Sequence, residues 1–209
     1  CATLPDPDRA LAQMAEDYVT QTYAHAPGKQ PTAQTVSQVF GATLQERLGG
    51  RAAQVLDSPR YRLHVLTSRG RHLLGREGRI RTPLGYAGAF FSNAAHRRGL
   101  GLWLERVLFS DPRDALPLVL SDFRTHQVAL SVGDLAAAVL ASCSIPFWLQ
   151  AVHDIPGAPR GAYWDGGITD YHLHLDYGQM QDGLVLYPHF QSTVVPGWLD
   201  KSLKHRHAA

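Results

Sequence analysis

The segment from Leu135 to Asp170 constrains the fold of this chain most strongly. Its first part is an apolar run after Asp134, which can cap a helix, and the run stops at Ile145-Pro146 because proline cannot continue a helix. Its second part is a short strand pattern that runs into Asp165-Gly166-Gly167. A capped helix followed by a strand and a glycine turn favours a layered fold of helices and strands.

Helical and strand patterns interleave through the rest of the 209 residues. Helices are predicted after Pro5 and over residues 35–48 and 100–108, because apolar residues recur there at three- and four-residue spacing. Strands are predicted over residues 61–67, 116–120, 127–131 and 183–187. We therefore predict an α/β fold and a single domain over residues 1–209.

Composition removes several classes of protein. The formal net charge of +2 gives no basic field of the kind that nucleic-acid-binding proteins use. No apolar run approaches the roughly 18 residues of a membrane span. The two cysteines, Cys1 and Cys143, lack metal-ligand spacing, although a disulfide between them is left open. We expect no cofactor and no nucleic-acid partner.

The Asp165-Gly166-Gly167 turn is the strongest candidate for chemistry. An aspartate at the end of a strand, followed by two glycines, can project its carboxylate into a cleft, and the glycines let backbone or substrate approach closely. The alternative is an ordinary turn, because Asp-Gly is a common turn dipeptide.

Context favours the functional interpretation of this turn. The run Ala141-Ser142-Cys143-Ser144-Ile145-Pro146-Phe147, followed by Trp164-Asp165-Gly166-Gly167-Ile168-Thr169-Asp170, is similar to the second half of the patatin-like serine acyl hydrolase (phospholipase) family. The resemblance implies a three-layer α/β/α fold, a lipid or acyl-ester substrate and a Ser-Asp dyad in which Asp165 is the catalytic aspartate. Tyr171 departs from the family, which usually has asparagine there.

The nucleophile of that family is missing from this chain. A Gly-x-Ser-x-Gly elbow occurs nowhere in it, and neither does a glycine-rich oxyanion loop. We expect the chain to begin a few residues past the serine and to lack the first strands of the fold. Its polar C-terminal end, residues 201–209, either frays or is cut short. By itself it should be inactive. Ser142 and Ser144 are poor substitutes because serines at helix ends usually bond local backbone, and Cys143 is expected to be buried.

Two other functions remain open. A patatin-like domain can also be a non-catalytic binding or scaffold module, and the residue in the elbow upstream of Cys1 would decide. The second alternative is an N-terminal-cysteine amidohydrolase, which predicts that Cys1 faces a pocket rather than lying at a surface end.

Residues Asp170, His172, His174 and Asp176 alternate and would share one face of a strand. Two imidazoles and two carboxylates could bind a metal ion. We favour a half-exposed strand, because apolar and aromatic residues alternate with these four, and we expect no metal.

A cluster of arginines lies close to three aromatic residues, Phe90, Phe91 and Trp103. Basic side chains beside exposed aromatics suit peripheral contact with anionic lipid headgroups, whereas a solvated loop over core aromatics would look the same. The compartment stays open, with the cytoplasm or a peripheral membrane position favoured. The arginines are Arg69, Arg71, Arg76, Arg79 and Arg81.

Overall fold

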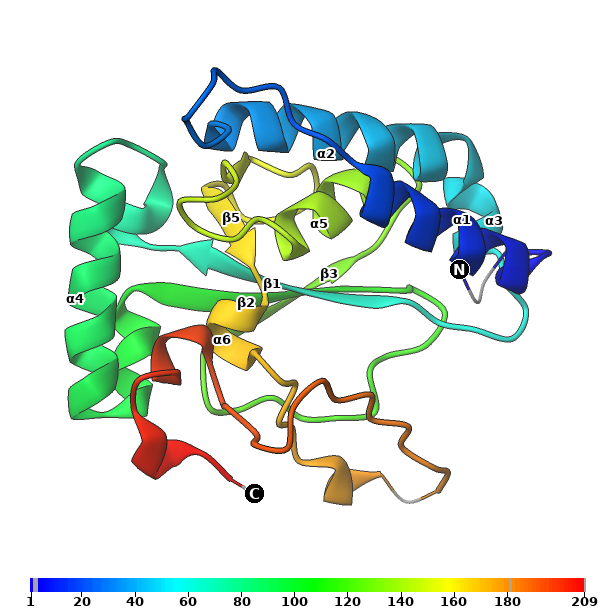
Figure 1. Ribbon diagram of the computed structural model, residues 1–209. Helices are drawn as coiled ribbons and strands as arrows, with labels where there is room; N and C mark the ends of the chain where they lie inside the picture. The colour runs from blue at the N-terminus through cyan, green and yellow to red at the C-terminus, as the bar shows by residue number, and fades with distance from the viewer. Residues whose placement is uncertain (2–3, 181, 209) are drawn as a thin grey trace.

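The computed structural model describes residues 1, 4–180 and 182–208, and a five-stranded sheet lies at its centre (Figure 1). The strand order is β3-β2-β1-β5-β4. Strand β1 pairs antiparallel with β2 and β5, β4 pairs antiparallel with β5, and β2 pairs parallel with β3. The prediction of a mixed α/β class is therefore confirmed. The strands are β1 (His64–Gly70), β2 (Leu104–Ser110), β3 (Thr125–Ala129), β4 (Val152–His153) and β5 (Ala162–Asp165).

Helix α5 (Leu135–Ser142) covers one face of the sheet and packs on β1 and β5. Helix α2 (Ala33–Leu48) lies over α5, and η1 (Gly49–Arg51) and α3 (Ala52–Leu56) follow it (Figure 1). The side chains beneath these helices form one core cluster, which includes Phe109 and Tyr163 of the sheet. The predicted helices over residues 35–48 and after Asp134 are confirmed.

The opposite face carries a second core cluster, built around Trp164 of β5 and Leu100. Helix α4 (Arg81–Ala95) packs there with η2 (His72–Gly75) and η3 (Arg97–Leu102). The short helix α6 (Gly167–Asp170) follows β5 directly, and a long irregular segment follows α6. That segment contains η4 (Tyr177–Gln179), η5 (Trp198–Asp200) and η6 (Lys204–Arg206).

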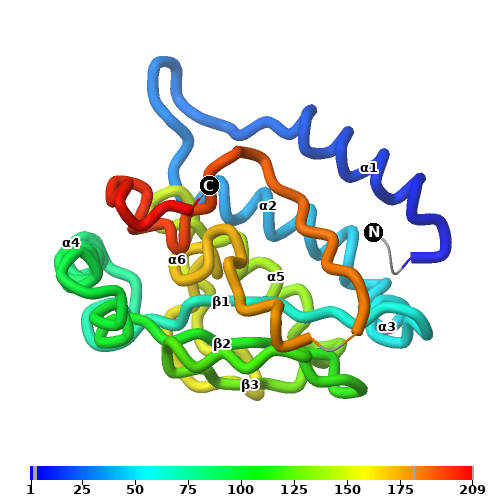
Figure 2. Tube along the Cα trace, turned by 90° about the horizontal axis from the view of Figure 1, so that it is seen from below, coloured from blue at the N-terminus to red at the C-terminus, as the bar shows by residue number. Residues whose placement is uncertain are grey.

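Helix α1 (Pro7–Thr20) begins where the sequence predicts, because the Asp6 side chain caps it by accepting a hydrogen bond from the Arg9 backbone N–H at 3.0 Å. Its apolar residues do not enter a core: Leu11 and Met14 are each 54% exposed and Tyr18 is 83% exposed. Figure 2 shows α1 standing apart from the sheet. No helix within the described ranges is both long enough and apolar enough to cross a bilayer.

Three predicted elements are wrong. Residues 100–108 form the end of η3 and most of β2 rather than one helix. Strand β2 is buried on both faces, so its sequence lacks the alternation by which a half-exposed strand is identified. Residues 116–120 form no strand, and neither do residues 183–187, where Leu184 and Leu186 are exposed to solvent. Residues 183–187 have the composition of a strand, but they pair with none of the strands in the described sheet.

Candidate functional site

Asp165 is the last residue of β5 and lies opposite Thr67 of β1 in the antiparallel register. Its backbone N–H donates to the carbonyl oxygen of Ser144, just past the end of α5, at 3.0 Å. Two elements that are distant in sequence therefore fix the position of Asp165. The structure thus places this aspartate at a strand end, as the sequence predicts.

The two glycines shape the turn by close approach. A Cβ on Gly166 would lie 2.3 Å from the backbone oxygen of Leu66, well inside van der Waals contact. The backbone N–H of Gly167 donates to Asp165 Oδ1 at 2.6 Å, and a Cβ on Gly167 would lie 2.9 Å from that same oxygen. The requirement for glycine here is steric, since Gly166 has an ordinary helical φ of −62°.

The Asp165 carboxylate has an unusual electrostatic environment. Desolvation raises its pKa above the ordinary range, although the hydrogen bond from Gly167 and the charge of Lys201 oppose that shift. Asp165 Oδ2 accepts no hydrogen bond from the described residues. The carboxylate is therefore more basic than a surface aspartate and keeps one oxygen available.

Tyr86 of α4 belongs to the same neighbourhood, although sequence patterns gave no reason to select it. Its side chain is buried, and its hydroxyl has no hydrogen-bond partner among the described residues. Burial raises its pKa well above the ordinary value, and the negative charges of Asp165 and Glu77 raise it further. The hydroxyl thus stays protonated and is a free hydrogen-bond donor near Asp165.

Cys143 corrects one prediction, because the structure leaves it exposed rather than buried. Local desolvation of its thiol and the charge of Asp165 raise its pKa to about 11. A thiol with that pKa is protonated at neutral pH and is a weak nucleophile. Within the described residues Cys1 and Cys143 are both free, so they form no disulfide.

Neither serine near the turn is arranged as a nucleophile. Ser142 Oγ donates to the carbonyl oxygen of Leu66 and Ser144 Oγ donates to that of Leu140, each at 2.8 Å. Both hydroxyl hydrogens are directed at backbone rather than at Asp165, as expected for serines at a helix end. Cys1 lines neither the cavity of about 540 Å³ beside Thr82 and Phe147 nor the one of about 460 Å³ beside Leu4 and Tyr61.

Aromatic side chains enclose Tyr86. Its ring packs edge to face with Trp164 and Phe147, both at a centroid distance of 5.7 Å, and with Trp198 at 6.4 Å. Phe147 has a φ of 71°, a left-handed conformation that costs a bulky residue on the order of 1–3 kcal/mol. The Trp164 indole N–H is also buried without a partner among the described residues.

A cavity of about 540 Å³ opens beside this aromatic group. Its walls come from Thr82 and Pro83 at the start of α4, from Glu77 and Arg79 before it, and from Phe147 and His153 across the opening. Phe147 lines the cavity and also packs against Tyr86, whose hydroxyl is influenced by the charge of Asp165. The cavity and Asp165 are therefore connected through these two aromatic residues.

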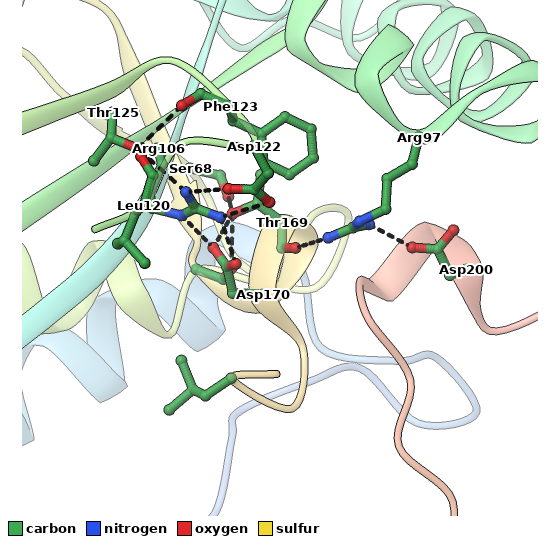
Figure 3. A network of polar contacts seen from close by, with 12 residues as sticks. Ser68, Arg97, Arg106, Leu120, Asp122, Phe123, Thr125, Thr169, Asp170 and Asp200 are labelled. Atoms are coloured by element: carbon green, nitrogen blue, oxygen red, sulfur yellow. Dashed lines mark hydrogen bonds and ion pairs between the residues drawn. The ribbon is translucent and has the colours of Figure 1, made fainter. Parts of the chain in front are cut away.

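Asp170, at the other end of α6, is part of a buried ion-pair network (Figure 3). The fully buried Arg106 of β2 donates to Asp170 at 2.8 and 2.6 Å and to Asp122 at 2.8 and 3.2 Å. Arg97 extends the network by bonding the Thr169 carbonyl and Asp200, each at 2.6 Å. Burial alone would lower the pKa of Arg106, but its bonds to Asp170 and Asp122 raise it.

The predicted strand over residues 170–176 is therefore wrong. Asp170 closes α6 and is occupied by Arg106, and the buried His172 accepts a hydrogen bond from the Val195 backbone N–H at 2.7 Å. His174 and Asp176 are exposed in an irregular segment. Within the described part of the chain, no group of three or more His, Cys, Asp or Glu side chains is placed to hold a metal ion.

The five arginines predicted to contact a membrane have different surroundings. Arg69 and Arg71 pair with the buried Glu105 at 2.5 and 3.5 Å, and Arg81 donates to backbone carbonyls of Leu73 and His72. The other two differ from these three: Arg76 reaches Asp154 at 3.6 Å, and Arg79 lines the cavity.

Comparison of the sequence with protein-family models and with curated proteins, and of the fold with solved structures, gives no match.

Proposed function

We propose that this chain is part of a patatin-like serine acyl hydrolase acting on acyl esters of lipids, with Asp165 as the general base. One observation carries the proposal: a desolvated carboxylate of raised pKa sits at a glycine-enforced strand end and keeps one oxygen available. The nucleophilic serine is proposed to come from residues of the protein outside these 209.

In the proposed reaction Asp165 Oδ2 takes the proton of the serine hydroxyl as the serine oxygen attacks the ester carbonyl carbon. The tetrahedral intermediate collapses, the bond to the alcohol breaks, and Asp165 returns the proton to the departing alkoxide. Water then attacks the acyl-serine with Asp165 again as base, which releases the fatty acid and restores the serine. The raised pKa suits this role, because a general base works best when its pKa lies near the operating pH.

The finer fold belongs to the same proposal. Helices α5 and α2 on one face of the sheet and α4 on the other are compatible with a three-layer α/β/α arrangement. We propose that this arrangement is the patatin-like one without its first strands.

The test uses the longer protein that carries residues upstream of Cys1, assayed for hydrolysis of p-nitrophenyl butyrate and for labelling by a fluorophosphonate. Asp165→Asn should lower kcat/KM by about a hundredfold or more, because a positioned base contributes that much. The control Asp176→Asn changes an exposed carboxylate and should leave the rate unchanged. Activity that is equal in Asp165→Asn and wild type would overturn the proposal.

A non-catalytic patatin-like binding module is the second candidate. It shares the fold of the hydrolase and differs from it in the residue at the nucleophile elbow, and no Gly-x-Ser-x-Gly sequence occurs in these 209 residues to decide between them. It predicts a longer protein that neither hydrolyses esters nor reacts with fluorophosphonate, whereas the hydrolase predicts a labelled serine.

A further inference from the structure

The outer face of α4 exposes a row of apolar side chains. Ile80, which precedes the first turn, is 73% exposed, Leu84 is 58% exposed and Phe91 is 70% exposed. Ala87 is exposed between them. Spacings of four, three and four residues put all four on one side of a helix. We call Ile80, Leu84, Ala87 and Phe91 the α4 stripe.

The orientation of the α4 stripe is fixed by the opposite face of the same helix. Gly85, Tyr86, Ala89 and Asn93 are buried, and a Cβ on Gly85 would lie 2.6 Å from a methyl carbon of Leu74. Asn93 also donates to the buried Asp200 at 2.7 Å. The helix cannot rotate to bury the stripe without breaking these contacts. Helix α4 forms one edge of the molecule in both views (Figures 1 and 2).

The segment that contains α4 has basic residues but no acidic ones. The sequence contains no aspartate or glutamate from Gly78 to Leu104. Arg79 precedes α4 and Arg98 follows it; both are exposed, and neither side chain forms an ion pair or hydrogen bond with the described residues. Exposed apolar side chains flanked by unpaired arginines are the pattern of a helix that lies in a membrane interface beside anionic lipid.

Helix α1 shows that apolar exposure alone would not identify a partner. It too exposes large apolar residues, but acidic ones accompany them. Asp6 caps it, Asp8, Glu16 and Asp17 lie within it, and Arg9 is its one basic residue. An anionic surface would repel that helix.

The α4 stripe begins at the mouth of the 540 Å³ cavity. Arg79 and Pro83 belong to the cavity wall and are neighbours of Ile80 and Leu84 in the chain. Phe147, which also lines the cavity, is 53% exposed, and the adjacent Trp148 is 61% exposed. Exposed apolar side chains beside this cavity therefore come both from α4 and from residues 147–148.

We propose that the α4 stripe, with Arg79 and Arg98, docks the protein on an anionic lipid surface. The inference goes beyond acyl hydrolysis, because docking requires no chemistry and can be measured without a nucleophile. It also changes which arginines matter. Arg69, Arg71 and Arg81 are half-exposed and already bonded to groups of the protein, so the proposed lipid contact uses Arg98 in their place.

The first experiment is co-sedimentation of the protein with phosphatidylcholine vesicles, with and without phosphatidylserine. Wild type should bind the anionic vesicles. The variant Ile80→Ser/Leu84→Ser/Phe91→Ser should lose about tenfold or more in lipid partition, because burial of three apolar side chains is removed. The control Leu184→Ser/Leu186→Ser changes two fully exposed leucines elsewhere and should bind like wild type. Unfolding curves of both variants should match that of wild type, because all five positions are exposed.

The second experiment addresses charge. Arg79→Ala/Arg98→Ala should weaken binding to phosphatidylserine vesicles by about tenfold, and binding of wild type should fall steeply with salt. Arg51→Ala/Arg60→Ala, two exposed arginines outside the α4 region, is the matched control. Quenching of Trp148 by brominated lipid should accompany docking, and Trp148→Phe should remove most of the signal.

Three results would overturn the proposal. The first is failure of wild type to bind anionic vesicles. The second is binding that the stripe variant retains. The third is a self-association, seen by sedimentation velocity, that the stripe substitutions abolish while vesicle binding persists, because the stripe would then be an interface between two copies of the protein.

Discussion

The aspartates at the two ends of helix α6 lie in opposite electrostatic environments. Asp170 at its C-terminal end receives two charge-assisted hydrogen bonds from the buried Arg106. Asp165, two residues before the start of α6, is desolvated and receives one backbone hydrogen bond from Gly167. A carboxylate whose oxygens are both paired is not available to react, and loss of its partner would leave an uncompensated buried charge. The comparison separates a structural aspartate from one that is kept basic.

The largest effect is expected from breaking the pair at Asp170. Arg106→Met leaves Asp170 buried without its cation, and removal of one partner of a buried ion pair costs about 3–5 kcal/mol. Urea unfolding should show that loss in the free energy of unfolding. A loss below 1 kcal/mol would mean that Asp170 is no better stabilised than Asp165.

The next largest effect is expected at the glycine that follows Asp165. Gly166→Ala places a methyl group 2.3 Å from the Leu66 carbonyl oxygen, and overpacking of this kind costs about 1–3 kcal/mol. Gly50→Ala is the control, because a Cβ there meets nothing within 4 Å. Equal melting temperatures for the two variants would show that the turn is not sterically fixed.

At Asp165 itself we expect the opposite sign. Asp165→Asn should raise the free energy of unfolding by about 1 kcal/mol at neutral pH, since a desolvated charge is removed. The raised pKa means that the folded state holds this proton more tightly than the unfolded state, so wild type loses stability as pH rises through that pKa. The difference between the two proteins should therefore disappear in acid. Unfolding curves measured across acidic and neutral pH check this, and a destabilised Asp165→Asn would contradict it.

The smallest effect is expected at Asp122, the second partner of Arg106. Its side chain is 51% exposed, so Asp122→Ala should cost about 0.5 kcal/mol, as exposed ion pairs usually do. Partial burial would raise the pKa of Asp122, but the hydrogen bond from Arg106 lowers it. A loss as large as that of Arg106→Met would show that the network acts as one unit.

Local patterns predicted the elements whose ends are marked in the sequence. Asp6 and Pro7 mark the start of α1, Pro146 closely follows the end of α5, and the Asp-Gly-Gly turn marks the end of β5. Strand β2 was missed because both of its faces are buried and its apolar spacing also fits a helix. Glu105 and Arg106 inside that apolar run are a signal of buried ion pairs, because charges in a core require partners.

Most of the site depends on contacts between distant residues. Arg106 reaches Asp170 across 64 residues, and the turn at Gly166 fits against Leu66, which is 100 residues away. Tyr86 belongs to an unremarkable helical pattern, and only the folded chain leaves its hydroxyl buried and unpartnered near Asp165. A single sequence predicted the aspartate but could not predict its surroundings.

Helices α1 and α4 lie at opposite ends of the molecule (Figures 1 and 2); α1 carries three acidic residues, whereas α4 lies within a stretch, residues 78–104, that has none. The charges of these two elements therefore contribute a dipole along this direction, although the net charge of the chain is only +2. In the field near a negatively charged bilayer, such a dipole experiences a torque that turns the α4 end toward the surface before any contact forms. The uneven distribution of charge would thus set the orientation in which the protein first meets the bilayer. The net charge alone does not show this orientation.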